Sequence, residues 1–373
     1  EGKGFITFAD GSTYDGDWLD GKMTGEGTAV YADGTIYTGG FLNTKHHGQG
    51  TLQTPSGYVY TGSWASGVKE GSAQVTFADG STYEGEIVDG KREGQGKLVV
   101  PNGVTYTGSW KGGQFDGEGR LELANGDVYE GTLVQGKRDG AGTMTYANGS
   151  VYEGQFTADK RNGEGTFRAD DGYRYEGSWA DGKIDGKGTI TYQDGSSYAG
   201  AVSTGEPNGT GKITYKDGSS YEGTWVAGKI EGSGVARYAS GIVYEGEFRD
   251  GKTHGMGTIT YPDGYVYAGE WVDGVKQGRG EATFSDGTKY LGDFVDGERD
   301  GTGTLIAKNG FRYTGQWSNG DYHGTGTAEY TNGDVYEGEF QDGKRWGEGT
   351  LKYVSGQVES GTWEDGVLVK PAE

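Results

Sequence analysis

Cysteine is absent from this sequence, and histidine and proline are scarce. Without cysteine the chain has no disulfides and no thiolate metal ligands. Of its four histidines, His46, His47, His254 and His323, only the first two are adjacent, and nothing nearby supplies the third ligand that a zinc site needs. We therefore expect neither a metal site nor a cofactor.

Long apolar runs and helical periodicity are absent too. No apolar run approaches the ~20 residues that a transmembrane helix needs, and no segment places apolar residues at helical spacing. Apolar residues make up only 32% of the chain and the net charge is −22. Taken alone, such values favour disorder, so the order must come from a pattern that composition does not show.

That pattern is a unit of 23 residues, which recurs along the whole chain without insertion or deletion. The tyrosine that leads the unit stands at positions 14, 37, 60, 83, 106, 129, 152, 175, 198, 221, 244, 267, 290, 313 and 336. Glu359 takes its place in the last copy, which keeps Gly361 and Trp363. A fixed period in this range indicates an array of supersecondary units, each too small to fold alone.

Glycine follows the same period. Five positions of the unit, which lie two, seven, eleven, thirteen and twenty residues after the tyrosine, hold 77 of the 79 glycines; only Gly40 and Gly112 fall elsewhere. Glycine placed so regularly meets a requirement of the backbone or of close packing. We expect aromatic rings to lie against the glycines of neighbouring strands.

Alternation within the unit predicts two strands. In residues 175–179, Tyr, Gly and Trp alternate with Glu and Ser, and residues 186–192 alternate in the same way. Period-two alternation is typical of a strand with one apolar face. The sequence therefore predicts an all-β fold, an elongated single-layer antiparallel array of about 32 short strands in hairpins that coils into a twisted rod.

Two kinds of connection are expected between the strands. Asp-Gly or Asn-Gly stands at one of them in most units, as at Asp217-Gly218. These dipeptides favour tight hairpin turns, because both residues tolerate positive φ. We expect the other connection, such as residues 181–186, to be longer and more variable.

One copy shows the family resemblance clearly. Residues 244–248, 251–257 and 263–264 read YEGEF, GKTHGMG and DG, and they resemble the MORN repeat (membrane occupation and recognition nexus). The resemblance extends over nearly the whole chain. It implies a β-hairpin array whose relatives serve as self-associating scaffolds, as partner-binding grooves or as lipid binders, with no catalysis shared by the repeat itself.

We interpret residues 1–373 as one continuous array of about 16 units. Residues 1–13 form a half-repeat at the start, and residues 359–373 form an atypical C-terminal cap. The chain begins in mid-repeat without Met, so we expect further residues upstream of Glu1, either repeats or a signal peptide.

The hypothesis for function is a non-enzymatic scaffold that binds protein partners, with a peptide or helix lying in an aromatic groove and a homodimer formed at the C-terminal end. The expected groove residues are Tyr175, Trp179, Tyr192, Tyr221, Trp225, Tyr238, Tyr244, Phe248, Tyr267 and Trp271. The expected self-association residues are Trp346, Tyr353, Val358, Trp363, Val367 and Leu368. No catalytic residue is expected, because the recurring glutamates lie on the polar strand face rather than in a desolvated pair.

Three alternatives stay open at this point: a membrane or phosphoinositide binder, a regulatory arm of an enzyme whose catalytic domain lies outside this chain, and a cell-surface carbohydrate binder. Acidic residues outnumber basic ones by 55 to 33, so we expect no nucleic acid partner and only weak or indirect membrane contact. The turn pairs 91–92, 137–138 and 160–161, each Lys-Arg, form the one expected basic ridge. We expect a cytoplasmic location, near the cytoskeleton or a membrane.

Overall fold

The protein is built from short strands and turns, as a computed structural model that describes residues 1–372 shows. These residues form 33 strands and contain no helix. No segment of the described chain is therefore a helix of the length and apolarity that crossing a membrane requires. The chain divides into two compact units, residues 1–186 and 187–373, and each is described by itself.

In the first unit, each strand from β1 to β16 pairs antiparallel with the next strand in the sequence. The strands are β1 (Gly2–Thr7), β2 (Thr13–Leu19), β3 (Lys22–Val30), β4 (Ile36–Leu42), β5 (Lys45–Gln53), β6 (Val59–Ala65), β7 (Val68–Thr76), β8 (Thr82–Val88), β9 (Lys91–Val99), β10 (Thr105–Lys111), β11 (Gln114–Glu122), β12 (Val128–Val134), β13 (Lys137–Thr145), β14 (Val151–Thr157), β15 (Lys160–Arg168) and β16 (Arg174–Ala180). Strand β17 (Lys183–Thr191) spans the division between the units.

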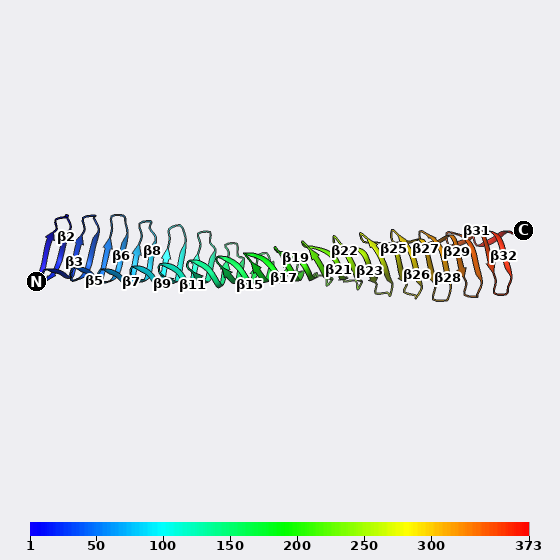
Figure 1. Ribbon diagram of the computed structural model, residues 1–373, viewed down its shortest axis with the longest axis horizontal. Coiled ribbons are helices and arrows are strands. Elements are labelled where there is room, and N and C mark those ends of the chain that lie inside the picture. The colour runs from blue at the N-terminus through cyan, green and yellow to red at the C-terminus, as the bar shows by residue number, and fades with distance from the viewer. Residues whose placement is uncertain (373) are drawn as a thin grey trace. The chain divides into compact units, whose positions relative to one another are not determined.

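The second unit repeats this arrangement from β18 to β33, again with each strand antiparallel to the next. Its strands are β18 (Ser197–Ser203), β19 (Glu206–Thr214), β20 (Ser220–Val226), β21 (Lys229–Arg237), β22 (Val243–Arg249), β23 (Lys252–Thr260), β24 (Val266–Val272), β25 (Val275–Thr283), β26 (Lys289–Val295), β27 (Glu298–Ile306), β28 (Arg312–Ser318), β29 (Asp321–Glu329), β30 (Val335–Gln341), β31 (Lys344–Lys352), β32 (Val358–Glu364) and β33 (Val367–Pro371). Within each unit the strands follow one another in a single layer (Figure 1).

The core of each repeat is a tyrosine ring that lies over two glycines. In β20 and β21, Gly223 pairs with Gly234 across the strands. A Cβ atom built on Gly234 would lie 2.5 Å from the ring of Tyr221, and one on Gly223 would be equally close to its hydroxyl. All fifteen repeat tyrosines are 0–2% exposed. The predicted packing of rings against glycines is confirmed, and it explains two of the five glycine positions.

A bulge in each hairpin creates a polar group that the tyrosine then satisfies. In β20–β21 the single residue Thr224 faces the three residues 231–233, and Gly232 takes a φ of +63° there. This bulge interrupts the regular ladder. The Tyr221 hydroxyl donates to the carbonyl of Thr224 at 3.1 Å. The same hydrogen bond, from tyrosine to the carbonyl three residues on, occurs in all fifteen repeats.

Aromatic side chains link each repeat to the next. The ring of Tyr221 meets Trp225 of its own strand edge-on at 5.5 Å and Phe248 of the next repeat at 5.0 Å. The Trp225 indole also donates to the carbonyl of Gly211 at 3.1 Å. Edge-to-face pairs of this kind contribute ~0.5–1.5 kcal/mol beyond their buried area. Stability therefore depends on contacts between neighbouring repeats.

The prediction for the two connections was wrong, because their roles are reversed. The tight connection is the one that follows the strand with the repeat tyrosine and tryptophan. After β20, for example, Ala227 and Gly228 form a two-residue turn with φ of +46° and +77°. Two successive positive φ values are typical of a type I′ hairpin turn. The long strand that follows begins at once, at Lys229.

The Asp-Gly connection is the longer one. Between β19 and β20 the Tyr215 amide donates to the Ser219 carbonyl at 2.8 Å and closes the loop. Only Gly218 has a positive φ, of +87°. Asp217 acts through its carboxylate, which accepts a hydrogen bond from the Ser219 amide at 2.9 Å. The aspartate is therefore selected for its oxygen atoms rather than for its tolerance of positive φ.

Removing one ring tests this core. We expect Tyr221→Ala to cost ~3–5 kcal/mol locally, as for other buried aromatic truncations, and Tyr221→Phe to cost only ~1 kcal/mol for the lost hydrogen bond. Since each repeat contacts only its neighbours, hydrogen exchange should rise around residues 198–248 and stay unchanged at residues 14–60. A uniform loss of protection along the chain would contradict this nearest-neighbour description.

Candidate functional site

The aromatic face of the sheet is largely covered by the chain's own side chains. The covering residue lies nine positions after each repeat tyrosine, and we call it the filler. The fillers are Met23, His46, Lys69, Arg92, Phe115, Arg138, Arg161, Ile184, Pro207, Ile230, Thr253, Lys276, Arg299, Tyr322, Arg345 and, after Glu359, Leu368. Phe115, for example, stacks on Tyr106 with ring centroids 3.9 Å apart.

Arginine is the commonest filler, and its contacts are the same in several repeats. The Arg92 guanidinium lies 4.2 Å from the centroid of the Trp110 ring and donates to the Gly113 carbonyl at 2.9 Å. Arg161 makes the equivalent contacts, at 4.1 Å from the ring of Trp179. Arg299 and Arg345 repeat both contacts in the second unit.

The expected basic ridge is therefore only partly present. Arg92, Arg138 and Arg161 are half-buried against aromatic rings, while the lysine before each of them is exposed. Burial lowers the pKa of the Arg92 guanidinium. The arginines thus serve the packing of the aromatic face and are not offered to an external surface.

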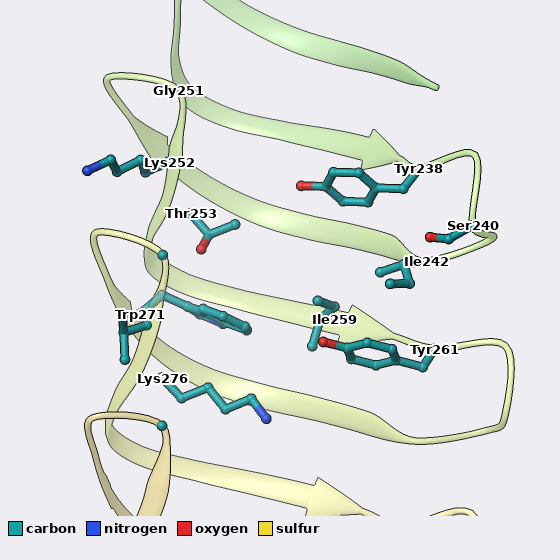
Figure 2. A pocket seen from close by; sticks show the side chains of 13 residues that line it. Tyr238, Ser240, Ile242, Gly251, Lys252, Thr253, Ile259, Tyr261, Trp271 and Lys276 are labelled. Carbon is teal, nitrogen blue, oxygen red and sulfur yellow. The ribbon is translucent and has the colours of Figure 1, made fainter. Parts of the chain in front are cut away.

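One filler is too short to cover the face. Thr253 in β23 leaves a groove of about 610 Å³ (Figure 2), which we call the Thr253 groove. Its lining comes from the three consecutive strands β23, β24 and β25 and from neighbouring connections: Tyr238, Ser240, Ile242, Gly251, Lys252, Thr253, Ile259, Tyr261, Trp271, Gly274, Val275, Lys276 and Gly297. Pro207 is as short as Thr253 but is itself buried. The groove thus combines an apolar floor with phenol hydroxyls and ammonium groups at its rim.

The groove walls differ in exposure and charge. Tyr238 is 47% exposed, whereas Trp271 is 5% exposed. The Lys276 ammonium donates to the Tyr265 hydroxyl at 2.7 Å and lies 4.7 Å from the centroid of that ring. Burial lowers the pKa of Lys276. The cation is therefore held by the neighbouring repeat and flanks the groove without filling it.

The structure separates the predicted groove residues into two sets. Eight of them belong to the row of buried aromatic rings that links the repeats, which we call the ladder of rings. These eight, all 0–6% exposed, are Tyr175, Trp179, Tyr221, Trp225, Tyr244, Phe248, Tyr267 and Trp271. The other two, Tyr192 and Tyr238, lie after the long strand of their repeats and are half-buried and exposed, respectively. Tyr238 and Trp271 come together in the Thr253 groove.

Sequence reasoning missed the fillers and the groove residues Ile242, Ile259 and Tyr261. A signal was present, because the position nine after each tyrosine carries a long side chain in nearly every repeat, and Thr253 is an exception to it.

The predicted self-association residues also fall into two sets. Trp363 is 3% exposed and belongs to the ladder, and Tyr353 and Leu368 are half-buried. Trp346, Val358 and Val367 are 37%, 58% and 63% exposed. Val354 adds a fourth exposed apolar side chain, with 75% exposure. Residues 346–367 therefore carry a concentration of exposed apolar surface.

The polar face holds ion pairs between exposed side chains, such as Lys212 and Glu222 at 3.7 Å in β19 and β20. Exposed pairs of this kind contribute little to stability. Among residues 1–372, no group of three or more acidic or histidine side chains is arranged to hold a metal ion.

Comparison with known proteins identifies the repeat. The family model described as MORN repeat matches sixteen consecutive segments: residues 1–13, 14–36, 37–57, 60–82, 83–105, 106–128, 129–151, 152–172, 175–197, 198–220, 221–243, 244–264, 267–289, 290–312, 313–335 and 336–358. No curated protein matches the sequence.

Similarity to solved structures is weak. The TCP domain of SAS-4 from Drosophila melanogaster, solved with a proline-rich motif of Ana2, is 16% identical with a TM-score of 0.28, over 48% of this chain and 90% of that one. The G-box domain of the microcephaly protein CPAP is 15% identical with a TM-score of 0.23, over 60% of this chain and 100% of that one.

His46 provides a test of the filler position. Its ring stacks on Tyr37 with centroids 3.6 Å apart, and burial lowers its pKa to about 4. Between the ordinary histidine pKa of 6.5 and about 4, the unfolded chain binds a proton that the folded chain does not. Stability of this region should therefore fall as the pH drops through that window.

The matched variant is His46→Phe, because Phe115 fills the same position elsewhere. We expect protection from hydrogen exchange at residues 37–64 to decline from neutral pH toward the pKa of about 4 in the natural chain. The decline should be smaller in His46→Phe. An equal decline in both proteins would assign the pH dependence to carboxylates instead.

Proposed function

The chain belongs to the MORN repeat family, and on this premise we propose that it is a non-enzymatic interaction array that binds a protein partner on its aromatic face. The observation that carries the proposal is the Thr253 groove, a hollow of about 610 Å³ in a face that fillers cover elsewhere. A repeated scaffold with one uncovered position offers a defined place for a partner.

The lining of the groove favours a peptide. Tyrosine side chains give large, rigid contact areas with a polar tip, which suits recognition of a peptide that carries both apolar and polar groups. Tyr238 and Tyr261 supply two such side chains, and Ile242 and Ile259 supply apolar surface between them. An extended segment or one face of a helix can present a single side chain to such a hollow.

Self-association is the second part of the proposal. The exposed side chains of Trp346, Val354, Val358 and Val367 support it, because exposed apolar surface that is gathered in one region marks interaction sites. We propose a homodimer formed through this region. The excess of acidic over basic residues, 55 to 33, supports protein partners over nucleic acid or anionic lipid. We also propose that the protein lies in the cytoplasm beside cytoskeletal or membrane-bound assemblies.

Peptide display on the full chain tests the binding face. We expect selected peptides to lose binding by about tenfold or more, or ~1.4 kcal/mol, when Tyr238 and Tyr261 are both changed to serine. Leu291→Ser is the matched control, since Leu291 is 56% exposed at a position of the polar face and its loss should leave binding unchanged. Peptides sensitive to Leu291 alone would move the site to the polar face, and binding of liposomes in place of peptides would favour the lipid-binding alternative.

Light scattering tests the dimer. Changing both Val358 and Val367 to lysine should halve the measured mass, because two charges would then be buried in the interface. Val226→Lys is the control, since Val226 is 52% exposed in a distant repeat. A natural chain with the mass of one 39.5 kDa monomer, or a dimer that survives both lysines, would contradict the proposal.

A further inference from the structure

The chain contains an internal copy of the Thr253 groove that its own side chains already fill in part. Eight repeats earlier, Lys69, Val75, Phe77, Ile87 and Gly90 line a groove at the same repeat positions as Thr253, Ile259, Tyr261, Trp271 and Gly274. Its volume is only about 280 Å³. The smaller Ile87 in place of tryptophan would enlarge it, but the longer Lys69 side chain takes the place of Thr253, and Arg92 also lines it.

What fills the equivalent space is a cation. The Lys69 ammonium lies 4.6 Å and 5.0 Å from the ring centroids of Tyr58 and Tyr60. Seven of the sixteen fillers are lysine or arginine. The aromatic face is thus repeatedly matched to a long cationic side chain, which gains from the negative face of the ring.

The chain also shows which cation fits which position. Both lysine fillers have a tyrosine eleven residues earlier whose hydroxyl accepts from the ammonium: Tyr58 for Lys69 and Tyr265 for Lys276, each at 2.7 Å. The corresponding residue for Thr253 is Ile242, which offers no acceptor.

The acceptor used by arginine is retained in the Thr253 groove. Arg92 and Arg161 each lie over a tryptophan and donate to the backbone carbonyl of the glycine 21 residues on. For Thr253 the matching tryptophan is Trp271 and the matching glycine is Gly274, and both line the groove. The position therefore has the surroundings of an arginine filler but carries threonine.

We propose that the Thr253 groove takes an arginine side chain of a protein partner, which occupies the place that the chain's own arginines occupy in other repeats. This inference rests on the proposed function and names the chemistry of the partner at that groove. The guanidinium lies against Trp271 and donates to the Gly274 carbonyl, while the aliphatic stem lies along Ile259 and Tyr261. Because Trp271 is 5% exposed, most of the contact area comes from these walls and from Tyr238.

Charge is compatible with this occupant. Lys252 and Lys276 stand beside the groove. Arginine fillers elsewhere in the chain also have basic neighbours: Lys91 precedes Arg92, and the fillers Arg138 and Arg161 occupy successive repeats. The net charge of −22 favours a basic partner over an acidic one through long-range attraction.

The experiment uses the full chain with fluorinated tryptophan and the peptide Ser-Gly-Arg-Gly-Ser. The Trp271 resonance is assigned with the variant Trp271→Phe. This variant should keep the fold, because the preceding repeat has a phenylalanine, Phe248, at the equivalent position. We expect the arginine peptide to shift this resonance. Peptides with citrulline, which has the shape of arginine without its charge, or with leucine should bind at least about tenfold more weakly.

Two variants make the result decisive. Thr253→Arg should fold normally, since arginine fills this position in five other repeats, and it should abolish the shift because the groove is then occupied from within. Lys69→Thr should open a second groove, where the Tyr58 hydroxyl makes a lysine peptide bind at least as well as the arginine peptide.

Equal binding of the citrulline or leucine peptide, a shift that persists in Thr253→Arg, or no shift at all would overturn the arginine assignment. None of these outcomes would contradict the proposed function, because peptide display with the tyrosine variants tests that function without assuming arginine.

Discussion

The placement of one tyrosine ring over a pair of facing glycines is the constraint on which the rest of the structure depends. A Cβ atom on Gly27 or Gly234 would lie 2.5 Å from the ring of Tyr14 or Tyr221, so neither glycine can carry a side chain unless the ring moves. The ring then covers backbone that would otherwise face solvent, and its hydroxyl satisfies the carbonyl left by the bulge. A single-layer sheet thereby obtains a core without a second layer of structure.

The coverage of the aromatic face follows from this arrangement. Each ring has an open side, and the filler residue closes it with a cation, an aromatic ring or an aliphatic chain. The identity of the filler can vary because it stabilises its repeat by contact with rings that are already fixed. This freedom allows one repeat to carry a threonine and leave a groove without loss of the ladder, in which Tyr244 still meets Trp271 edge-on at 5.5 Å. The binding site that we propose lies at such a filler position.

The period predicted the fold well, because strand alternation and the phase of tyrosine and glycine are local properties of the sequence. The turns were predicted in the wrong order for a physical reason: Asp-Gly occurs at both connections, as at Asp20-Gly21 and Asp33-Gly34, and only the structure shows which one has two residues. The site was harder to predict. Alternation places Tyr221 and Trp225 on the apolar face but does not show that fillers bury them. The depth of the Thr253 groove depends on three-dimensional packing against Ile259 and Tyr261.

Spectrophotometric titration of the tyrosines tests the central claim most directly. Burial raises the pKa of Tyr37, Tyr60, Tyr83, Tyr106 and Tyr129 to about 12. Their stabilising contribution should therefore be complete below the ordinary tyrosine pKa of 10.0 and be lost as the pH rises toward about 12. We predict that these five tyrosines ionise only near that upper value, together with loss of the strand signal in circular dichroism. Ionisation of these five tyrosines near pH 10.0 with the strands intact would contradict a core made of buried, hydrogen-bonded tyrosines.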